Sequence, residues 1–123
     1  MTPSSLTLVG AEVRLRMMRS DDRAQLISIR STAEVRAWWS GGDLDRGFTA
    51  DLADAGTTRL VIEVGGAVVG LVQFTEERDP EFRHASIDIY VDPAVHRQGI
   101  ATDSIRAVIA HLVDDLGHHR ITI

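Results

Sequence analysis

The sequence predicts a layered α/β domain in which a mixed, mostly antiparallel sheet is flanked by helices. Segments 59–64 and 67–74 are rich in β-branched residues and are separated by two glycines, which is typical of an antiparallel hairpin. Segment 84–123 has a strand–helix–strand pattern, and such a crossover joins parallel strands. The antiparallel hairpin precedes this parallel pair, and the turn after the strand over 84–91 lacks the three-glycine spacing, so the pattern differs from the doubly wound dinucleotide fold.

The first element is a strand over 12–18, where every second residue is apolar. Ser20–Asp22 then supplies capping residues for a helix over about 21–30. We expect the apolar face of this helix to contain Ala24, Leu26 and Ile27.

Two short helices follow over about 32–39 and 49–55, and glycines bound both of them. The hairpin strands come next, and Gly65-Gly66 provides its two-residue turn. The following strand, over 84–91, ends at Asp92-Pro93. Its alternation divides it into one face with Ile87, Ile89 and Val91 and another with Ser86, Asp88 and Tyr90.

An amphipathic helix over about 102–116 ends at Gly117. Its apolar positions recur at helical spacing and are Ile105, Val108, Ile109, Leu112 and Val113. The last segment, 118–123, is predicted to be a strand parallel to 84–91. This is the fifth predicted strand.

Composition narrows the classes of function. The chain has 123 residues, a formal net charge of −5, no cysteine and no lysine. An acidic protein without clustered basic residues is a poor nucleic-acid binder, so we expect no nucleic-acid partner. No segment has the length of a membrane span or the pattern of a secretory signal. We therefore expect one cytoplasmic domain over 1–123 with no membrane partner.

The segment from Val91 to Thr102 predicts a binding site for an anion. A strand, a short turn with Gly99 and a helix follow one another, which directs unpaired backbone N–H groups and the helix dipole to one place. The alternative is that Gly99 serves a tight turn and nothing more.

The hexapeptide His96-Arg97-Gln98-Gly99-Ile100-Ala101 resembles the pyrophosphate-binding turn of the GNAT superfamily of acetyl-CoA-dependent N-acetyltransferases. That turn has Gln or Arg first, Gly fourth and Gly or Ala sixth, so Gly99 and Ala101 match and His96 departs. The resemblance extends over 12–123, because the preceding Ile-x-Val-Asp-Pro, the hairpin and the amphipathic helix stand in the family's order.

The Trp pair in Val35–Gly42 is similar to a segment of the aminoglycoside 6′-N-acetyltransferase branch, and Ser86-Ile87-Asp88 is similar to its Gly-Ile-Asp at the catalytic carboxylate. The family normally continues with another strand, a helix and a final strand. The sequence therefore predicts a C-terminally incomplete domain, truncated after the fifth strand. This leaves open a truncated, non-catalytic domain that binds acetyl-CoA, a homodimer through the exposed C-terminal strand edge, or a fragment of a longer product.

The resemblance implies acetyl-CoA as co-substrate and a primary amine of a small molecule, aminoglycosides among the candidates, as acceptor. Backbone groups of the turn, with Arg97, would bind pyrophosphate, and the strand backbone would pair with the pantetheine arm. The implied cofactor-binding residues are Ile89, Tyr90, Val91, His96, Arg97, Gln98, Gly99, Ile100, Ala101 and Thr102.

Asp88 is the predicted general base, or the anchor for the substrate ammonium, and Tyr90 is a secondary participant. An ordinary solvent-facing carboxylate is the alternative, and His84 is a weaker base candidate. Trp38 and Trp39 are predicted to wall the acceptor site, the alternative being a pair partly in the core.

The remaining polar clusters carry weaker predictions. The acidic loop around Glu76–Arg83 would attract a polycationic substrate or is a solvated loop. No metal is predicted, because the histidines at 111, 118 and 119 lack ligand spacing with other residues.

Overall fold

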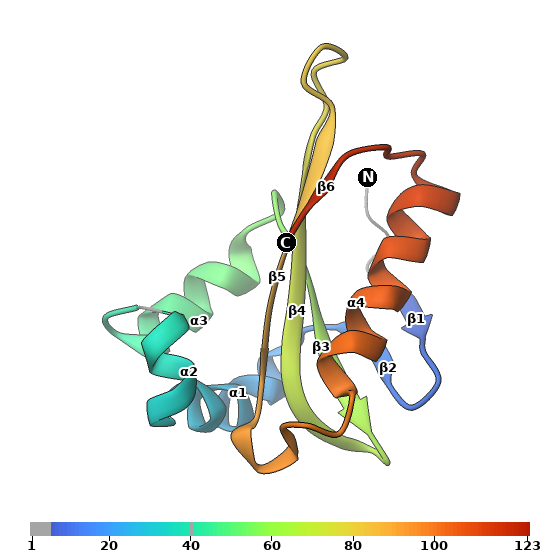
Figure 1. The fold of residues 1–123 in the computed structure, drawn as a ribbon. Helices are drawn as coiled ribbons and strands as arrows, with labels where there is room; N and C mark the ends of the chain where they lie inside the picture. Colours follow the sequence, from blue (N-terminus) through green and yellow to red (C-terminus); the bar gives the residue numbers. More distant parts are fainter. Residues whose placement is uncertain (1–5, 40) are drawn as a thin grey trace.

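The computed structural model describes residues 6–39 and 41–123 and confirms the predicted fold class. Within these residues six strands form one sheet in chain order, and helices cover both of its faces (Figure 1). Every neighbouring pair is antiparallel except β5 and β6, which are parallel, as the crossover predicts. The strands are β1 (Thr7–Val9), β2 (Arg14–Met17), β3 (Thr58–Val64), β4 (Ala67–Glu77), β5 (His84–Val91) and β6 (Ile121–Thr122).

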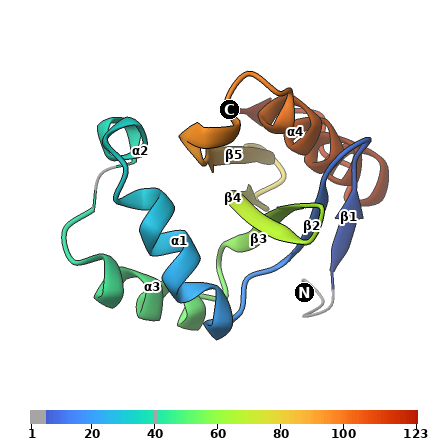
Figure 2. The ribbon, with the colours of Figure 1, turned by 90° about the horizontal axis from the view of Figure 1, so that it is seen from below.

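The helices lie in two groups on opposite sides of the sheet (Figure 2). Helices α1 (Arg23–Arg30), α2 (Ala33–Trp38) and α3 (Leu44–Ala53) cover one face, and α4 (Ile100–Ala110) covers the other. Strand alternation sends side chains into both layers, so each face has its own core. Leu71 and Tyr90 belong to the core beneath α1–α3, whereas Ile87 and Val91 belong to the core beneath α4. The predicted two faces of β5 are thus confirmed.

The central hairpin is confirmed at its turn. Gly65 and Gly66 have φ angles of 59° and 85°, and a type I′ turn requires a left-handed conformation at both positions. Near the same end, the register of β3 and β4 shifts between Ile62 and Glu63, which leaves Val69 as the extra residue of a bulge. Beside it, Gly70 faces Val91 of β5, and a Cβ on Gly70 would lie 2.3 Å from the Tyr90 carbonyl oxygen.

Several predicted boundaries were wrong. Strand β1 was not predicted, because it has three residues and its Val9 side chain is 74% exposed, which leaves no periodic signal. The final strand is therefore the sixth, and it covers only Ile121–Thr122. Helix α3 begins at Leu44 instead of 49, because Asp43 caps it by accepting the Arg46 N–H at 3.1 Å.

Two predicted helix faces also change. In α1 the buried residues are Leu26 and Ile29, whereas Ala24 is exposed. After α4, a π-helical turn over His111–Asp115 widens the helix, so the period of 3.6 no longer holds. Val113, predicted on the apolar face, is consequently 43% exposed, while Leu112 is buried.

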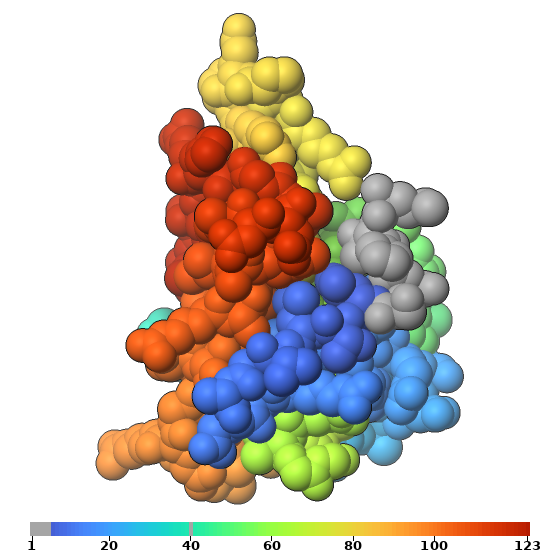
Figure 3. All heavy atoms as spheres, turned by 90° about the vertical axis from the view of Figure 1, so that its right-hand side faces the viewer, coloured from blue at the N-terminus to red at the C-terminus, as the bar shows by residue number. Residues whose placement is uncertain are grey.

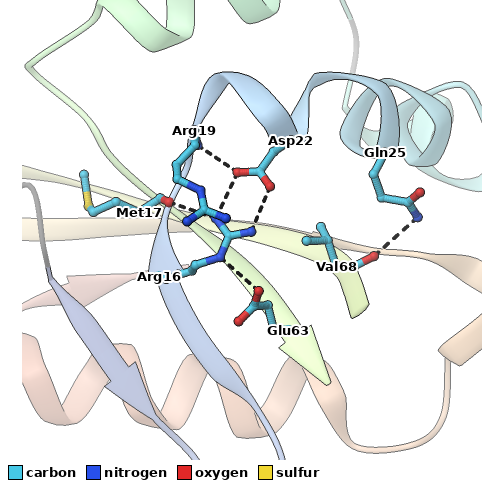
Figure 4. A network of polar contacts seen from close by, with 7 residues as sticks. All are labelled: Arg16, Met17, Arg19, Asp22, Gln25, Glu63 and Val68. Carbon is cyan, nitrogen blue, oxygen red and sulfur yellow. Dashed lines mark hydrogen bonds and ion pairs between the residues drawn. The ribbon is translucent and has the colours of Figure 1, made fainter. Parts of the chain in front are cut away.

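A buried ion-pair network fixes α1 on the sheet (Figure 4). The Arg16 guanidinium on β2 donates to both carboxylate oxygens of Asp22 at 3.0 and 2.9 Å and to Glu63 on β3 at 2.9 Å. Asp22 also accepts the Arg19 N–H at 2.7 Å and is 4% exposed. In a separate contact, Gln25 on α1 donates to the Val68 carbonyl of β4 at 3.3 Å. The α1–α3 group is therefore held in register with the centre of the sheet.

Candidate functional site

The site begins where β5 loses its neighbour. Strands β5 and β6 pair only at Ala85–Ile121 and Ser86–Thr122 among the described residues, and β5 then runs on to Val91 (Figure 1). The Ala85 N–H donates to the Arg120 carbonyl at 2.9 Å. Backbone groups along β5 alternate between its two neighbours, so this bond places the odd-numbered residues on the β6 side. The backbone groups of Ile89 and Val91 therefore point to the uncovered edge, and those of Tyr90 point to β4. An edge of this kind can accept an extended ligand as an added strand.

Beyond β5, the turn into α4 has the conformation of an anion site. Arg97 and Gly99 are left-handed, with φ angles of 67° and 76°, and Gly99 is the N-cap of α4. Left-handed residues in such turns make successive N–H groups converge on one point. The first helical bond runs from the Asp103 N–H to the Gly99 carbonyl at 3.0 Å, so the N–H groups of Ile100, Ala101 and Thr102 have no helical acceptor.

His96 closes this turn onto the strand. Its Nε2 lies 3.0 Å from the Val91 carbonyl oxygen, which accepts the ring N–H. His96 thus links the first position of the turn to the last residue of β5. This contact gives a structural reason why histidine is compatible with the turn at that position.

A cavity of about 510 Å³ lies between α2, the end of β5, the turn and the start of α4. It brings together both tryptophans and all of the predicted cofactor residues except Gln98. Three lining residues were not predicted: Glu34, Val35 and Val95. The lining residues are Glu34, Val35, Trp38, Trp39, Ile89, Tyr90, Val91, Val95, His96, Arg97, Gly99, Ile100, Ala101 and Thr102.

The comparisons with known proteins agree with this geometry. The family model described as an acetyltransferase (GNAT) domain matches residues 12–123. The chain belongs to the GNAT family. A search of curated proteins finds no match. The match to the family model confirms the resemblance to the GNAT superfamily that the sequence indicated.

Solved structures of GNAT proteins share this fold at low sequence identity. The ribosomal L7/L12 α-N-protein acetyltransferase RimL has a TM-score of 0.77 and 15% identity over 98% of this chain and 73% of that one. A chimera of the spermidine N-acetyltransferase SpeG from Vibrio cholerae and hSSAT has a TM-score of 0.74 and 19% identity, over 90% and 69%. The aminoglycoside acetyltransferase AAC(6′)-Ib, solved with paromomycin and acetyl-CoA, has a TM-score of 0.73 and 23% identity, over 89% and 71%.

The two tryptophans of this GNAT chain have different environments. Trp39 is half-buried, and its ring meets Tyr90 edge-on with centroids 4.9 Å apart and planes at 76°. Trp38 is 92% exposed at the mouth of the cavity. The alternative of a partly buried pair therefore holds for Trp39 alone. Burial raises the pKa of the Tyr90 hydroxyl, so this group is protonated at neutral pH.

The predicted carboxylate, Asp88, does not line the cavity. It is exposed on the α1–α3 face of β5, opposite Gln73 of β4, and its carboxylate has no hydrogen-bond partner among the described residues. Its neighbour Ile89 does line the cavity. His84 lies at the other end of β5, where its Nδ1 is 2.7 Å from the Phe82 carbonyl oxygen. The structure thus separates His84 from the turn.

Two other histidines, His118 and His111, are engaged in contacts with carboxylates. His118 is buried with its Nε2 2.9 Å from Glu76, and His111 lies 2.7 Å from Asp115. No cluster of three or more metal-ligating side chains occurs within residues 6–39 and 41–123. No helix in this part of the chain has the length and hydrophobicity to cross a membrane.

Glu34 was missed for a physical reason. The helix over 32–39 was predicted, and Glu34 stands four positions before Trp38, on the same face. This spacing could have indicated that Glu34 lies beside Trp38 in the predicted acceptor wall. The direction in which α2 presents this face depends on its packing against β5, and periodicity within six helical residues does not determine that direction.

Proposed function

We propose that this GNAT chain is an acetyl-CoA-dependent N-acetyltransferase that acts on a primary amine of a small molecule, with aminoglycosides among the candidate acceptors. The supporting observation is the convergence, in one cavity, of the uncovered β5 edge and the unpaired N–H groups at the start of α4. GNAT acetyltransferases use acetyl-CoA, and AAC(6′)-Ib was solved with it.

The residues present fit this cofactor. The turn offers N–H groups and a helix N-terminus to the pyrophosphate, and Arg97 adds a cation at the same end of the cavity. The backbone of Ile89 and the N–H of Val91 offer edge hydrogen bonds to an amide-containing arm, whereas the Val91 carbonyl already accepts the His96 ring N–H. When bound, acetyl-CoA supplies the acetyl group as a thioester.

The acceptor must lose a proton, because an ammonium has no lone pair for attack on a carbonyl. Asp88 stays the predicted base: it is exposed and adjacent to the cavity-lining Ile89. Replacing it with Asn should lower kcat and leave the affinity for acetyl-CoA unchanged. Equal losses in both quantities would contradict this role.

The cofactor site is tested by a matched pair of substitutions on α4. Ala101 lines the cavity at the second helical position, and Ala110 is the last residue of the same helix; both are exposed. Ala101→Asp places a carboxylate on the anion site and should abolish acetyl-CoA binding in isothermal titration, whereas Ala110→Asp should bind like the wild type. Unchanged binding by Ala101→Asp would refute the proposed site.

Turnover is measured by release of free thiol from acetyl-CoA in the presence of amines. The chain has no cysteine, so the protein contributes no thiol background. Binding without release for any amine would favour the alternative of a non-catalytic acetyl-CoA-binding domain. The C-terminal strand β6 lies at the end of the sheet order, and its edge supports the predicted homodimer; a monomer in sedimentation at all concentrations would contradict that arrangement.

A further inference from the structure

The cavity is electrically divided along its length. At the α4 end lie Arg97, His96 and the helix N-terminus, which favour an anion. At the α2 end lies Glu34, which is the one carboxylate among the cavity-lining residues. A ligand that fills the site therefore meets positive charge at one end and negative charge at the other.

The surroundings of Glu34 are suited to a cation. Glu34 and Trp38 are four residues apart on one face of α2, and both line the cavity. Glu34 is exposed and has no hydrogen bond or ion pair among the described residues, so its carboxylate is available to a ligand. An aromatic face beside a carboxylate binds an ammonium through both charge and cation–π attraction.

Glu34 does not suit the amine that reacts. A carboxylate that pairs with an ammonium favours its charged form, and the reacting nitrogen must be neutral. The reacting nitrogen also has to reach the uncovered β5 edge, where the proposed cofactor arm lies. The position of Glu34 on α2, across the cavity from the turn, instead fits a second cationic group of the same acceptor.

We propose that Glu34 is a specificity-determining residue that binds a second, non-reacting ammonium, so that the acceptors are diamines or polyamines. This inference rests on the proposed acetyltransferase function. The cavity of about 510 Å³ is shared with the proposed cofactor arm, so the acceptor occupies its α2 side, and a short aliphatic diamine such as 1,5-diaminopentane is the simplest probe of a second ammonium. Arg97, at the α4 end, is assigned to the pyrophosphate, which leaves Glu34 as the charged side chain that lines the α2 side of the cavity.

The test compares two acceptors of equal chain length, 1,5-diaminopentane and 1-aminopentane, in the thiol-release assay. We expect the wild type to prefer the diamine about tenfold in kcat/KM. Glu34→Gln should raise the KM for the diamine about tenfold, with kcat and the KM for the monoamine nearly unchanged. Glu12→Gln removes the same charge from the β1–β2 turn, outside the cavity, and should behave like the wild type.

The outcomes separate this inference from the proposed function. Equal use of both amines by the wild type, or a preference that survives Glu34→Gln, would overturn the role of Glu34 while the acetyltransferase stands. If no amine releases thiol, the acetyltransferase proposal fails, and isothermal titration of 1,5-diaminopentane into the protein decides the role of Glu34. Binding lost in Glu34→Gln supports it, and binding that is absent or unaffected overturns it.

Discussion

Asp103 joins the start of α4 to the β1–β2 turn, and its removal is the sharpest test of the packing around the proposed cofactor site. Its carboxylate accepts the N–H groups of Ala11, Glu12 and Val13 at 2.8, 2.7 and 3.0 Å. Figure 3 shows the β1–β2 hairpin packed beside α4. Gly10 makes this approach possible, because a Cβ there would lie 2.6 Å from the carboxylate. Burial alone would raise the pKa of the Asp103 carboxyl, but the three N–H donors hold it below its usual value.

Asp103→Asn keeps one acceptor oxygen, which can stay at the Oδ2 position where the Glu12 and Val13 N–H groups converge, and places an NH₂ group against the Ala11 N–H. The Ala11 hydrogen bond is then lost and the other two lose their charge assistance, at about 1 kcal/mol for each of the three. The Ala11 N–H lies in an exposed turn and regains a water, which offsets part of this loss. We therefore expect a loss of about 2 kcal/mol in the free energy of unfolding and a Tm lower by about 8 °C.

Urea unfolding and calorimetry measure this change directly. Asp114→Asn is the matched control, because Asp114 is exposed in the π-helical turn that follows α4 and has no partner among the described residues. It should change the free energy of unfolding by less than about 0.5 kcal/mol. If the two variants were equally stable, the contact between Asp103 and the β1–β2 turn would contribute nothing, and the reasoning from these distances would be wrong.

Three further predictions concern the core and the cavity wall. Burial alone raises the pKa of Asp22, yet the hydrogen bonds from Arg16 and Arg19 hold it below its usual value of 3.8. The ionised carboxylate therefore stabilises the folded protein at neutral pH, and this contribution is lost as the pH falls through the pKa of the folded state. Asp22→Asn should cost about 3 kcal/mol at pH 7 and flatten the acid limb of a stability–pH curve; a parallel loss at every pH would contradict this. Gly70→Ala should destabilise by more than about 2 kcal/mol because its Cβ meets a backbone carbonyl, whereas Gly42→Ala has open space and should be neutral in thermal melts. Trp39→Ala should cost about 2 kcal/mol and Trp38→Ala less than about 0.5 kcal/mol, and equal losses in urea unfolding would refute the different environments of the two rings.

The elements that the sequence predicted well have periodic patterns several residues long. Strand β5 was predicted with its boundaries and both faces, and Gly65-Gly66 was sufficient to predict the hairpin turn. Strand β1 is too short to show a period. The π-helical turn was invisible to an analysis that assumes 3.6 residues per turn, and Val113 was misplaced for that reason.

The site divides in the same way. The turn at Gly99 was predictable because a left-handed backbone favours glycine, and a glycine is visible in the sequence. Gly99 is left-handed in the structure. The cavity wall on α2 was not predictable from the sequence, because α2 precedes the end of β5 by some fifty residues in the chain and forms the wall only where the two pack together. The same limit applies to Asp88: alternation predicted its face of the strand, but the extent of the cavity depends on how far α2 reaches along β5.

Strand β5 contributes to the proposed cofactor side of the cavity through its backbone and to the proposed acceptor side through a side chain. At its uncovered edge, β5 presents backbone groups of Ile89 and Val91, whereas on its α1–α3 face it presents the side chain of Tyr90, which supports Trp39. A cofactor bound through backbone groups tolerates many side chains, because the hydrogen bonds depend on strand geometry. The proposed acceptor wall on α2 consists of side chains, so substitutions such as those at Glu34 would change the substrate while the proposed cofactor half is kept. Under the proposed function, this division would allow proteins that share the fold at low sequence identity to this chain to keep one cofactor site and serve different amines.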